Sequence, residues 1–182
     1  MYAKVSNTNV VIEYPTNPIE GDESYVVVNE SPQPQANIGW VVQENTPVKE
    51  GNSWYQSWTS ILASKPQLKS EIANKRYQVE TCGISFNNTH FSTDRDSQTK
   101  YIGALLSVRQ ESNPSDVLIT WKLSDGSFIP LLGSDIIDLA VTVRNHVQNC
   151  YEKEAEYITL IDTANTSVLE STDFGSGWPS NY

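Results

Sequence analysis

The sequence contains few residues of the kinds that form disulfides, hold metals or bind polyanions. It has two cysteines, two histidines and 12 basic residues against 22 acidic ones. Cys82 and Cys150 are far apart and neither belongs to a C-x-x-C motif, so we expect reduced thiols and no disulfide framework or zinc site. A formal charge of −10 without a basic cluster repels phosphate and anionic lipid. We therefore expect no nucleic-acid partner and no membrane partner.

Long apolar runs are missing as well. No stretch of about eighteen apolar residues occurs, and residues 1–15 lack the basic and then apolar pattern of a secretory leader. We expect a soluble chain that is made in a cytoplasm. With 38% hydrophobic and 19% charged residues, the composition is that of a globular protein.

Residues 1–62 are expected to form a small antiparallel β unit. Short β-prone runs alternate there with stretches rich in proline, glycine and asparagine, and no helical period links them. Pro47 interrupts one run, which predicts that this strand lies at a sheet edge or ends there. Strand alternation places Trp54 and Trp58 on one face of the last run.

Aromatic side chains give this unit two interpretations. Their faces stack on sugars or seal protein interfaces, and small sheets also use them as core. We interpret Trp40, Trp54 and Trp58 as core or interface residues in preference to a glycan-binding face.

The composition changes at residues 63–75, which are rich in Lys, Glu, Ser and Ala and include Pro66. This predicts a linker that can become a short helix after the proline. An α+β domain of order ββαββα follows over residues 76–162. Its hairpins are predicted from the turn residues Asn87–Asn88 and Ser124–Gly126, with the first strand beginning at Tyr77.

Both helices of this domain carry start signals. Thr93 with Asp96 three residues later has the form of an N-cap, and Ser134 is the expected cap of the second helix. Gly103 is either a weak point of the first helix or a place of close packing. The second helix carries an apolar stripe to Ile161, roughly 27 residues or about 40 Å. Because so small a sheet cannot cover that length, its far end should pack on something else.

Two aspartates at D-x-D spacing raise the question of a metal site. Asp94 and Asp96 could bind a hard cation, which needs several converging oxygen ligands. A helix cap explains both acids, and no EF-hand glycine and glutamate follow. We therefore expect a cap and no metal ligand.

The histidines and cysteines that could take part in catalysis belong to no recognised catalytic motif. His90 and His146 belong to no H-E-x-x-H motif, and a catalytic base needs a positioned partner. A nucleophilic Cys82 or Cys150 paired with His146 has no local signature. We expect a protein that is not an enzyme, with no catalytic residue and no cofactor.

Residues 163–182 return to Ser, Thr and Gly with isolated aromatics, which predicts an extended tail. We expect Trp178 and Tyr182 to serve as interface residues, with the tail adding an edge strand or an aromatic anchor to a partner.

Four sequence blocks resemble a known family. They are an Arg-aromatic-x-Val-Glu block at Arg76, a T-D-R-D-S-Q block at Thr93, a W-K-x-x-D-G-x-F block at Trp121 and a V-R-x-H-V-Q-x-C block at Val143. From Lys75 to about Ile161 the chain resembles a family of domains of unknown function. This family recurs in tailed bacteriophages and prophages, commonly at the C-terminal end of tail-fibre and tail-fibre-assembly proteins. The upstream stretch SWYQSW is similar to a tryptophan-rich block that often precedes this domain.

The resemblance implies a place in the phage tail and no catalytic residues. We expect a virion protein that binds tail-fibre or baseplate subunits as an adaptor. A tail-fibre assembly chaperone and a host-surface glycan-binding module or enzyme are the alternatives. Homo-oligomers, as trimers or symmetric rings, are expected only by analogy with phage fibres.

Overall fold

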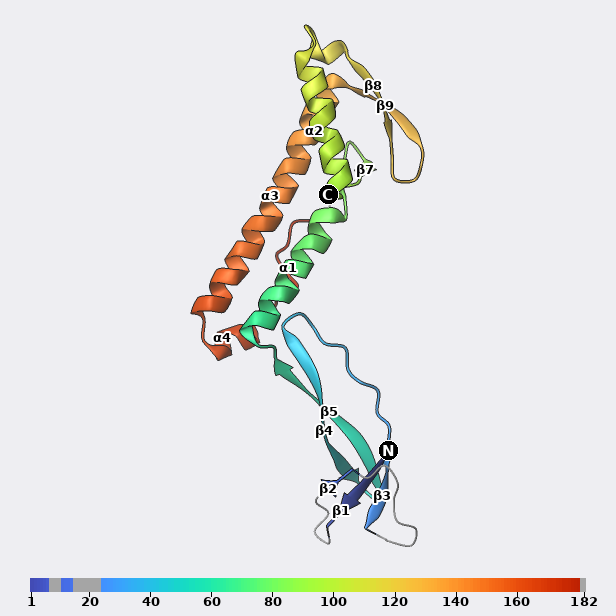
Figure 1. Ribbon diagram of the computed structural model, residues 1–182, viewed down its shortest axis with the longest axis vertical. Helices are drawn as coiled ribbons and strands as arrows, with labels where there is room; N and C mark the ends of the chain where they lie inside the picture. The colour runs from blue at the N-terminus through green and yellow to red at the C-terminus, as the bar shows by residue number, and fades with distance from the viewer. Residues whose placement is uncertain (7–10, 15–23, 181–182) are drawn as a thin grey trace. The chain divides into compact units, whose positions relative to one another are not determined.

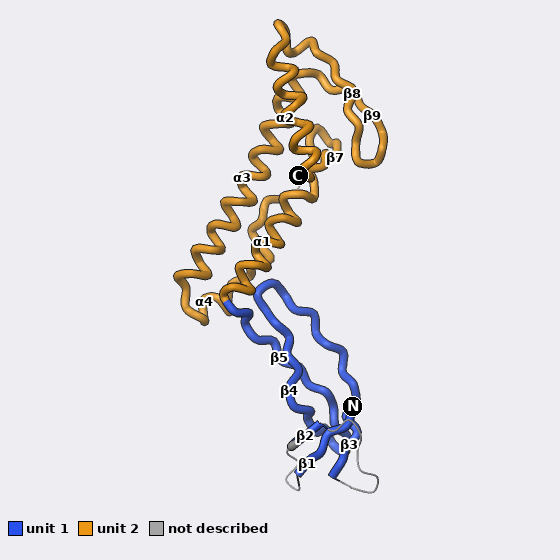
Figure 2. The backbone as a smooth tube through the Cα atoms, viewed as in Figure 1, with its two compact units in different colours: residues 1–64 blue, residues 65–182 orange. Residues whose placement is uncertain are grey.

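The computed structural model describes residues 1–6, 11–14 and 24–180. It divides into two compact units, Met1–Ser64 and Lys65–Tyr182, coloured separately in Figure 2. The boundary falls within the stretch predicted as a linker. A sheet forms the first unit, and helices with two hairpins form the second, so the α+β class is confirmed. No helix in the described part of the chain combines the length and the apolar character needed to cross a membrane.

The first unit is one five-stranded sheet with the order β2-β1-β3-β5-β4 (Figure 1). Its pairs are antiparallel except β3–β5, which is parallel. β4 lies at the edge, as Pro47 predicted, and the β4–β5 register shifts between Asn45 and Val48 because proline has no N–H to donate. The strands are Tyr2–Val5 (β1), Val11–Glu13 (β2), Tyr25–Asn29 (β3), Trp40–Glu50 (β4) and Ser53–Leu62 (β5).

Trp54 is part of the core of this sheet. Its side chain is buried with Ala3 and Val28, and three further valines pack against them. Of the two interpretations given for Trp54, core or interface, the structure shows core, because the small sheet needs this ring to fill its own interior. Trp58 is half-buried and its indole N–H donates to the Ser31 carbonyl over 3.1 Å. Trp40 is also half-buried.

The second unit is built around one long helix, α3, which runs beside both α1 and α2 (Figure 1). The predicted ββαββα order is present, with one more helix before it and one after it. Each hairpin is a separate two-stranded antiparallel sheet. The elements are α1 Lys65–Thr81, β6 Ile84–Phe86, β7 Thr89–Phe91, α2 Arg95–Gln110, the 3₁₀ turn η1 Pro114–Asp116, β8 Leu118–Lys122, β9 Phe128–Leu132, α3 Gly133–Thr163 and α4 Thr166–Ser171.

Helix α1 corrects two predictions, because residues 65–81 form one helix where we expected a linker and then a strand. Leu68 and Ile72 are buried four residues apart, and the same spacing continues to Arg76 and Glu80. Packing of this face along α3 outweighs the β-propensity of the residues near Tyr77. Pro66 suits the start of the helix, where a missing N–H costs nothing.

The predicted turn residues are confirmed, and the two predicted cap residues are wrong. Asn87 and Asn88 have the positive φ angles expected of a tight hairpin, 49° and 60°, and Gly126 has φ 88°. The cap of α2 is Asp94, not Thr93. Ser134 lies inside α3, whose start is instead stabilised by the Asp135 carboxylate accepting the Leu132 N–H over 3.1 Å.

The C-terminal segment folds back, so the predicted extended tail is wrong. Residues 166–171 form α4, and Phe174 is fully buried. The ring of Tyr157, near the far end of α3, lies 5.3 Å from the Phe174 ring and 5.7 Å from the Trp178 ring, centroid to centroid. The far end of α3 therefore packs on other elements, as its length predicted. Tyr182 lies outside the described residues.

The main core of the second unit joins α2 and α3 to both hairpins. Its buried side chains come from all four elements, so one face of the α2–α3 pair is covered by the hairpins. These residues are Ile84, Phe91, Tyr101, Val108, Leu131, Ile136, Leu139 and Val143.

Candidate functional site

Arg76 of α1 forms two ion pairs, one within its own helix and one that links α1 to α3. Glu80 is 2% exposed and accepts a hydrogen bond from the Arg76 guanidinium one helical turn earlier. The Nε of Arg76 also donates to the Glu154 carboxylate over 3.1 Å. Burial opposes the charge of Arg76, but the hydrogen bond to Glu80 and the neighbouring Tyr151 and glutamates outweigh it and raise the pKa of Arg76.

Two residues of the second block extend this network to α2. The Gln98 amide donates to the Glu80 carboxylate over 3.3 Å and to the Thr93 carbonyl over 2.7 Å. The buried Thr93 hydroxyl donates to the Glu80 carbonyl and accepts the Gly83 N–H over 2.9 Å. The buried Glu80 carboxylate therefore has two donors, Arg76 and Gln98, and the Glu80 backbone carbonyl accepts from Thr93.

His146 and Cys150 continue the network on α3. The His146 Nε2 lies 2.9 Å from the Val79 carbonyl and 3.9 Å from the Cys150 sulfur. Cys82 also contacts the Val79 carbonyl, over 2.9 Å. Burial and the nearby Glu80 carboxylate raise the pKa of the Cys150 thiol to about 11. At neutral pH Cys150 is therefore a thiol and not the thiolate that nucleophilic catalysis requires.

Asp94 acts as the cap of α2. Its Oδ1 accepts the Ser97 N–H over 2.8 Å, and its Oδ2 accepts the Ser92 and Ser97 hydroxyls over 2.5 and 2.9 Å. These hydrogen bonds, with that from Ser92 the strongest, hold the pKa of Asp94 at about 2. The prediction that these residues start a helix is confirmed, but the capping group is the Asp94 carboxylate and not the Thr93 hydroxyl.

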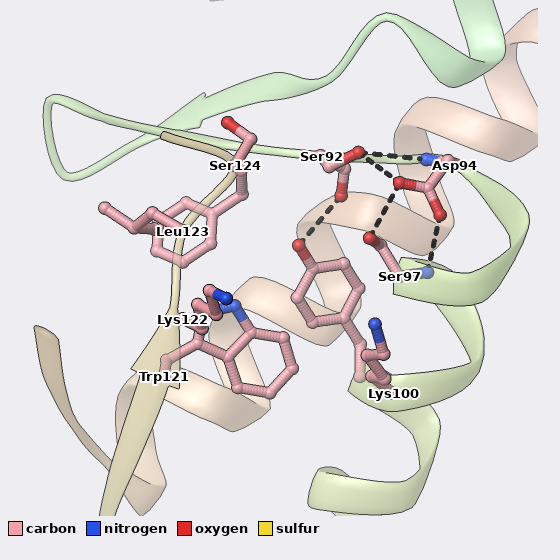
Figure 3. A pocket seen from close by; sticks show the side chains of 10 residues that line it. Ser92, Asp94, Ser97, Lys100, Trp121, Lys122, Leu123 and Ser124 are labelled. Atoms are coloured by element: carbon pink, nitrogen blue, oxygen red, sulfur yellow. Dashed lines mark hydrogen bonds between the residues drawn. The ribbon is translucent and has the colours of Figure 1, made fainter. Parts of the chain in front are cut away.

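Next to this cap is an open cleft of about 390 Å³, shown in Figure 3. The rings of Tyr101 and Trp121, which both line it, stack on each other with centroids 4.9 Å apart and planes 14° from parallel. The lining comes from the loop after β7, from α2 and from the end of β8. It comprises Phe91, Ser92, Asp94, Ser97, Lys100, Tyr101, Trp121, Lys122, Leu123 and Ser124.

The polar groups of the cleft are suited to holding structure. The Tyr101 hydroxyl donates to the Ser92 carbonyl over 2.8 Å, and burial together with the Asp94 charge raises its pKa to about 12. Tyr101 therefore stays protonated at neutral pH, and Asp94 stays ionised. The cleft is lined by the aromatic residues Phe91, Tyr101 and Trp121 and by Lys100 and Lys122.

Other sequence candidates lie apart from one another. His90 is exposed on β7, and His146 is buried on α3. Across the described residues, no three His, Cys, Asp or Glu side chains are grouped as metal ligands. The aromatic residues Trp54, Trp58 and Trp178 each have their own local partner: the sheet core, Ser31 and Phe174 respectively.

Sequence reasoning missed the Arg76–Glu80 pair and the role of Gln98. A signal was available, because an arginine and a glutamate four residues apart face each other on a helix. The sequence pattern at Tyr77 predicts a strand, and in a strand the side chains of Arg76 and Glu80 would not meet. No sequence pattern indicated the role of Gln98, because its partners Glu80 and Thr93 come from outside α2.

Comparison with known proteins gives one match. Residues 63–175, more than half of the chain, match a domain of unknown function, DUF4376. Neither the curated proteins nor the solved structures contain a match to the chain. The matched range contains the buried network, the cleft and all of the second unit from α1 to Phe174. The chain belongs to this family of domains of unknown function.

Proposed function

We propose that this protein is a non-enzymatic structural component of a bacteriophage tail, which joins fibre or baseplate subunits through protein–protein contacts. The proposal starts from the four blocks that resemble a domain of phage tail proteins. They lie within the matched range of residues 63–175. The block residues form intramolecular structure, and this observation carries the proposal.

The structural role of each block supports a scaffold. Arg76 and Glu80 of the first block pair in the interior, and Asp94 of the second caps α2. Trp121 of the third stacks on Tyr101, and His146 of the fourth contacts a backbone carbonyl of α1. Side chains that could do chemistry are held in hydrogen bonds, and a domain organised in this way acts through its shape.

Purified virions test this proposal. We expect mass spectrometry of gradient-purified particles to detect the protein at a stoichiometry comparable to that of other tail subunits. A capsid protein and an early cytoplasmic phage enzyme serve as positive and negative controls. Absence from mature particles, with the controls behaving as designed, would contradict a structural role.

One observation favours a second candidate, a tail-fibre assembly chaperone. Leu118 and Leu132 face each other across the β8–β9 ladder and are exposed, and Phe128 on the same face is 64% exposed. A transient partner would use such an apolar face. Co-expression tests this candidate: the chaperone should increase the yield of soluble fibre, and a fibre that folds equally well alone would remove it.

A further inference from the structure

An apolar groove of about 290 Å³ runs between α2 and α3, and the core residues Tyr101 and Val143 are part of its lining. Aliphatic side chains from both helices line most of it. Its only charged lining residue is Arg144. The lining residues are Gln98, Tyr101, Ile102, Leu105, Ala140, Val143, Arg144, Val147 and Gln148.

Two large side chains of α2 stand exposed beside this groove. Ile102 is 58% exposed and Leu106, one turn further along, is 56% exposed. Large aliphatic side chains at this spacing on one helix face are typical of a helix that packs against another. The groove and these two residues form a continuous apolar strip along α2.

The charges around the groove are basic although the protein is acidic. Arg144 lines it, and Arg109 lies seven residues after Ile102, so it projects from the same side of α2. In the described part of the chain, neither arginine forms an ion pair with a carboxylate. Asp94 is engaged in the α2 cap, and Asp135 accepts the Leu132 N–H. Asp96, in the first turn of α2, lies at the opposite end of this helix from Arg109.

We propose that the groove binds an amphipathic helix of a partner subunit, with an apolar stripe on Ile102, Leu105 and Val147 and acidic side chains facing Arg109 and Arg144. A helix that lies between two helices buries its apolar stripe in their groove, and charge complementarity selects its orientation and partner. This inference rests on the proposed adaptor function and states the chemistry of the partner.

A second copy of the chain fits this groove less well. A two-fold contact of the groove with itself would bring the arginines of both copies into one interface, because the same surface patch serves both subunits. Like charges at such a contact are repulsive. An acidic helix removes that repulsion.

Two designed peptides serve as probes. Both are about 18 residues long, so that a helix can form, and they share one leucine stripe. One carries glutamates beside the stripe and the other carries lysines at the same positions. With the full-length protein, fluorescence anisotropy should show at least about tenfold tighter binding of the acidic peptide, and salt should reduce this preference.

Substitutions at exposed positions locate the binding surface. Ile102→Ser and Leu106→Ser should each weaken acidic-peptide binding at least about fivefold, and Arg144→Glu should reverse the preference toward the lysine peptide. Val168→Ser is the matched control, because Val168 is also an exposed aliphatic residue but lies on α4, outside the groove. Circular dichroism should show the same fold for all variants.

Three results would overturn the inference. They are equal binding of both peptides, equal loss with Val168→Ser, and a dimer in light scattering that Ile102→Ser dissociates. The last would identify a second copy as the occupant. Peptide binding is measured on the isolated protein, so it can succeed or fail independently of the virion experiment that tests the proposed function.

Discussion

At the scale of single residues, the Asp94 carboxylate caps α2 and has a lowered pKa. Asp94→Ala removes the acceptor of the Ser97 N–H, so we expect it to lower the free energy of unfolding by about 1 kcal/mol at pH 7. Asn is also a good cap, so Asp94→Asn should cost less. Thermal denaturation followed by circular dichroism measures both.

The charge of Asp94 predicts a pH dependence. The folded protein holds the pKa at about 2, below the usual value of about 3.9. A group with a lowered pKa stabilises the fold above its unfolded pKa, and this contribution is lost as pH falls toward the folded pKa. The difference in unfolding free energy between wild type and Asp94→Asn should therefore be constant above about pH 5 and shrink between about pH 5 and pH 2. A constant difference down to pH 2 would contradict the assigned role of the charge.

Glu80 should be the most sensitive charged residue. Glu80→Ala leaves the Arg76 guanidinium buried with only Glu154, so we expect a loss of about 3–5 kcal/mol in chemical denaturation. Glu156→Ala breaks an exposed pair with Lys153 and should cost no more than about 1 kcal/mol. Replacing both partners, Arg76→Met with Glu80→Leu, should cost less than Glu80→Ala alone. Similar losses for Glu80→Ala and Glu156→Ala would exclude a buried pair.

At the scale of the helices, two glycines predict opposite effects. A Cβ at Gly103 in α2 would meet nothing within 4 Å, so Gly103→Ala should stabilise the protein by about 0.5–1 kcal/mol through helix propensity. A Cβ at Gly133, where α3 begins, would collide with the Pro114 carbonyl and lie 2.9 Å from a Val108 methyl. Gly133→Ala should therefore destabilise it by about 1–3 kcal/mol. Melting temperatures of the two variants should move in opposite directions, and the same direction for both would show that α3 does not begin against η1.

Pattern and packing contributed differently to the individual elements. Asn87–Asn88 and Ser124–Gly126 predicted both hairpins, because turn chemistry is local. The stripe to Ile161 predicted the length of α3, because a buried face repeats with the helical period. Helix α1 was missed, because residues near Tyr77 favour a strand until they pack on α3.

At the scale of the whole molecule, each unit has a core of its own. The core residues of the second unit all lie after Lys65, and those of the first lie before it. We therefore expect residues 65–182 expressed alone to be helical and to unfold cooperatively. Circular dichroism with thermal denaturation checks this expectation. A fragment without a cooperative transition would mean that residues 1–64 contribute to its core.

The sequence by itself determined the α+β class, the two hairpins, the long helix and the start of a helix close to Thr93. Each depends on local turn geometry or on a periodic apolar face, and both can be recognised from residues that are close together in the sequence. Only the tertiary structure decided that Arg76 meets Glu154 in the interior, that Phe174 returns to Tyr157, and that α2 and α3 leave an apolar groove. These features join residues far apart in the chain, and their energies depend on burial, which is settled only when the elements pack together.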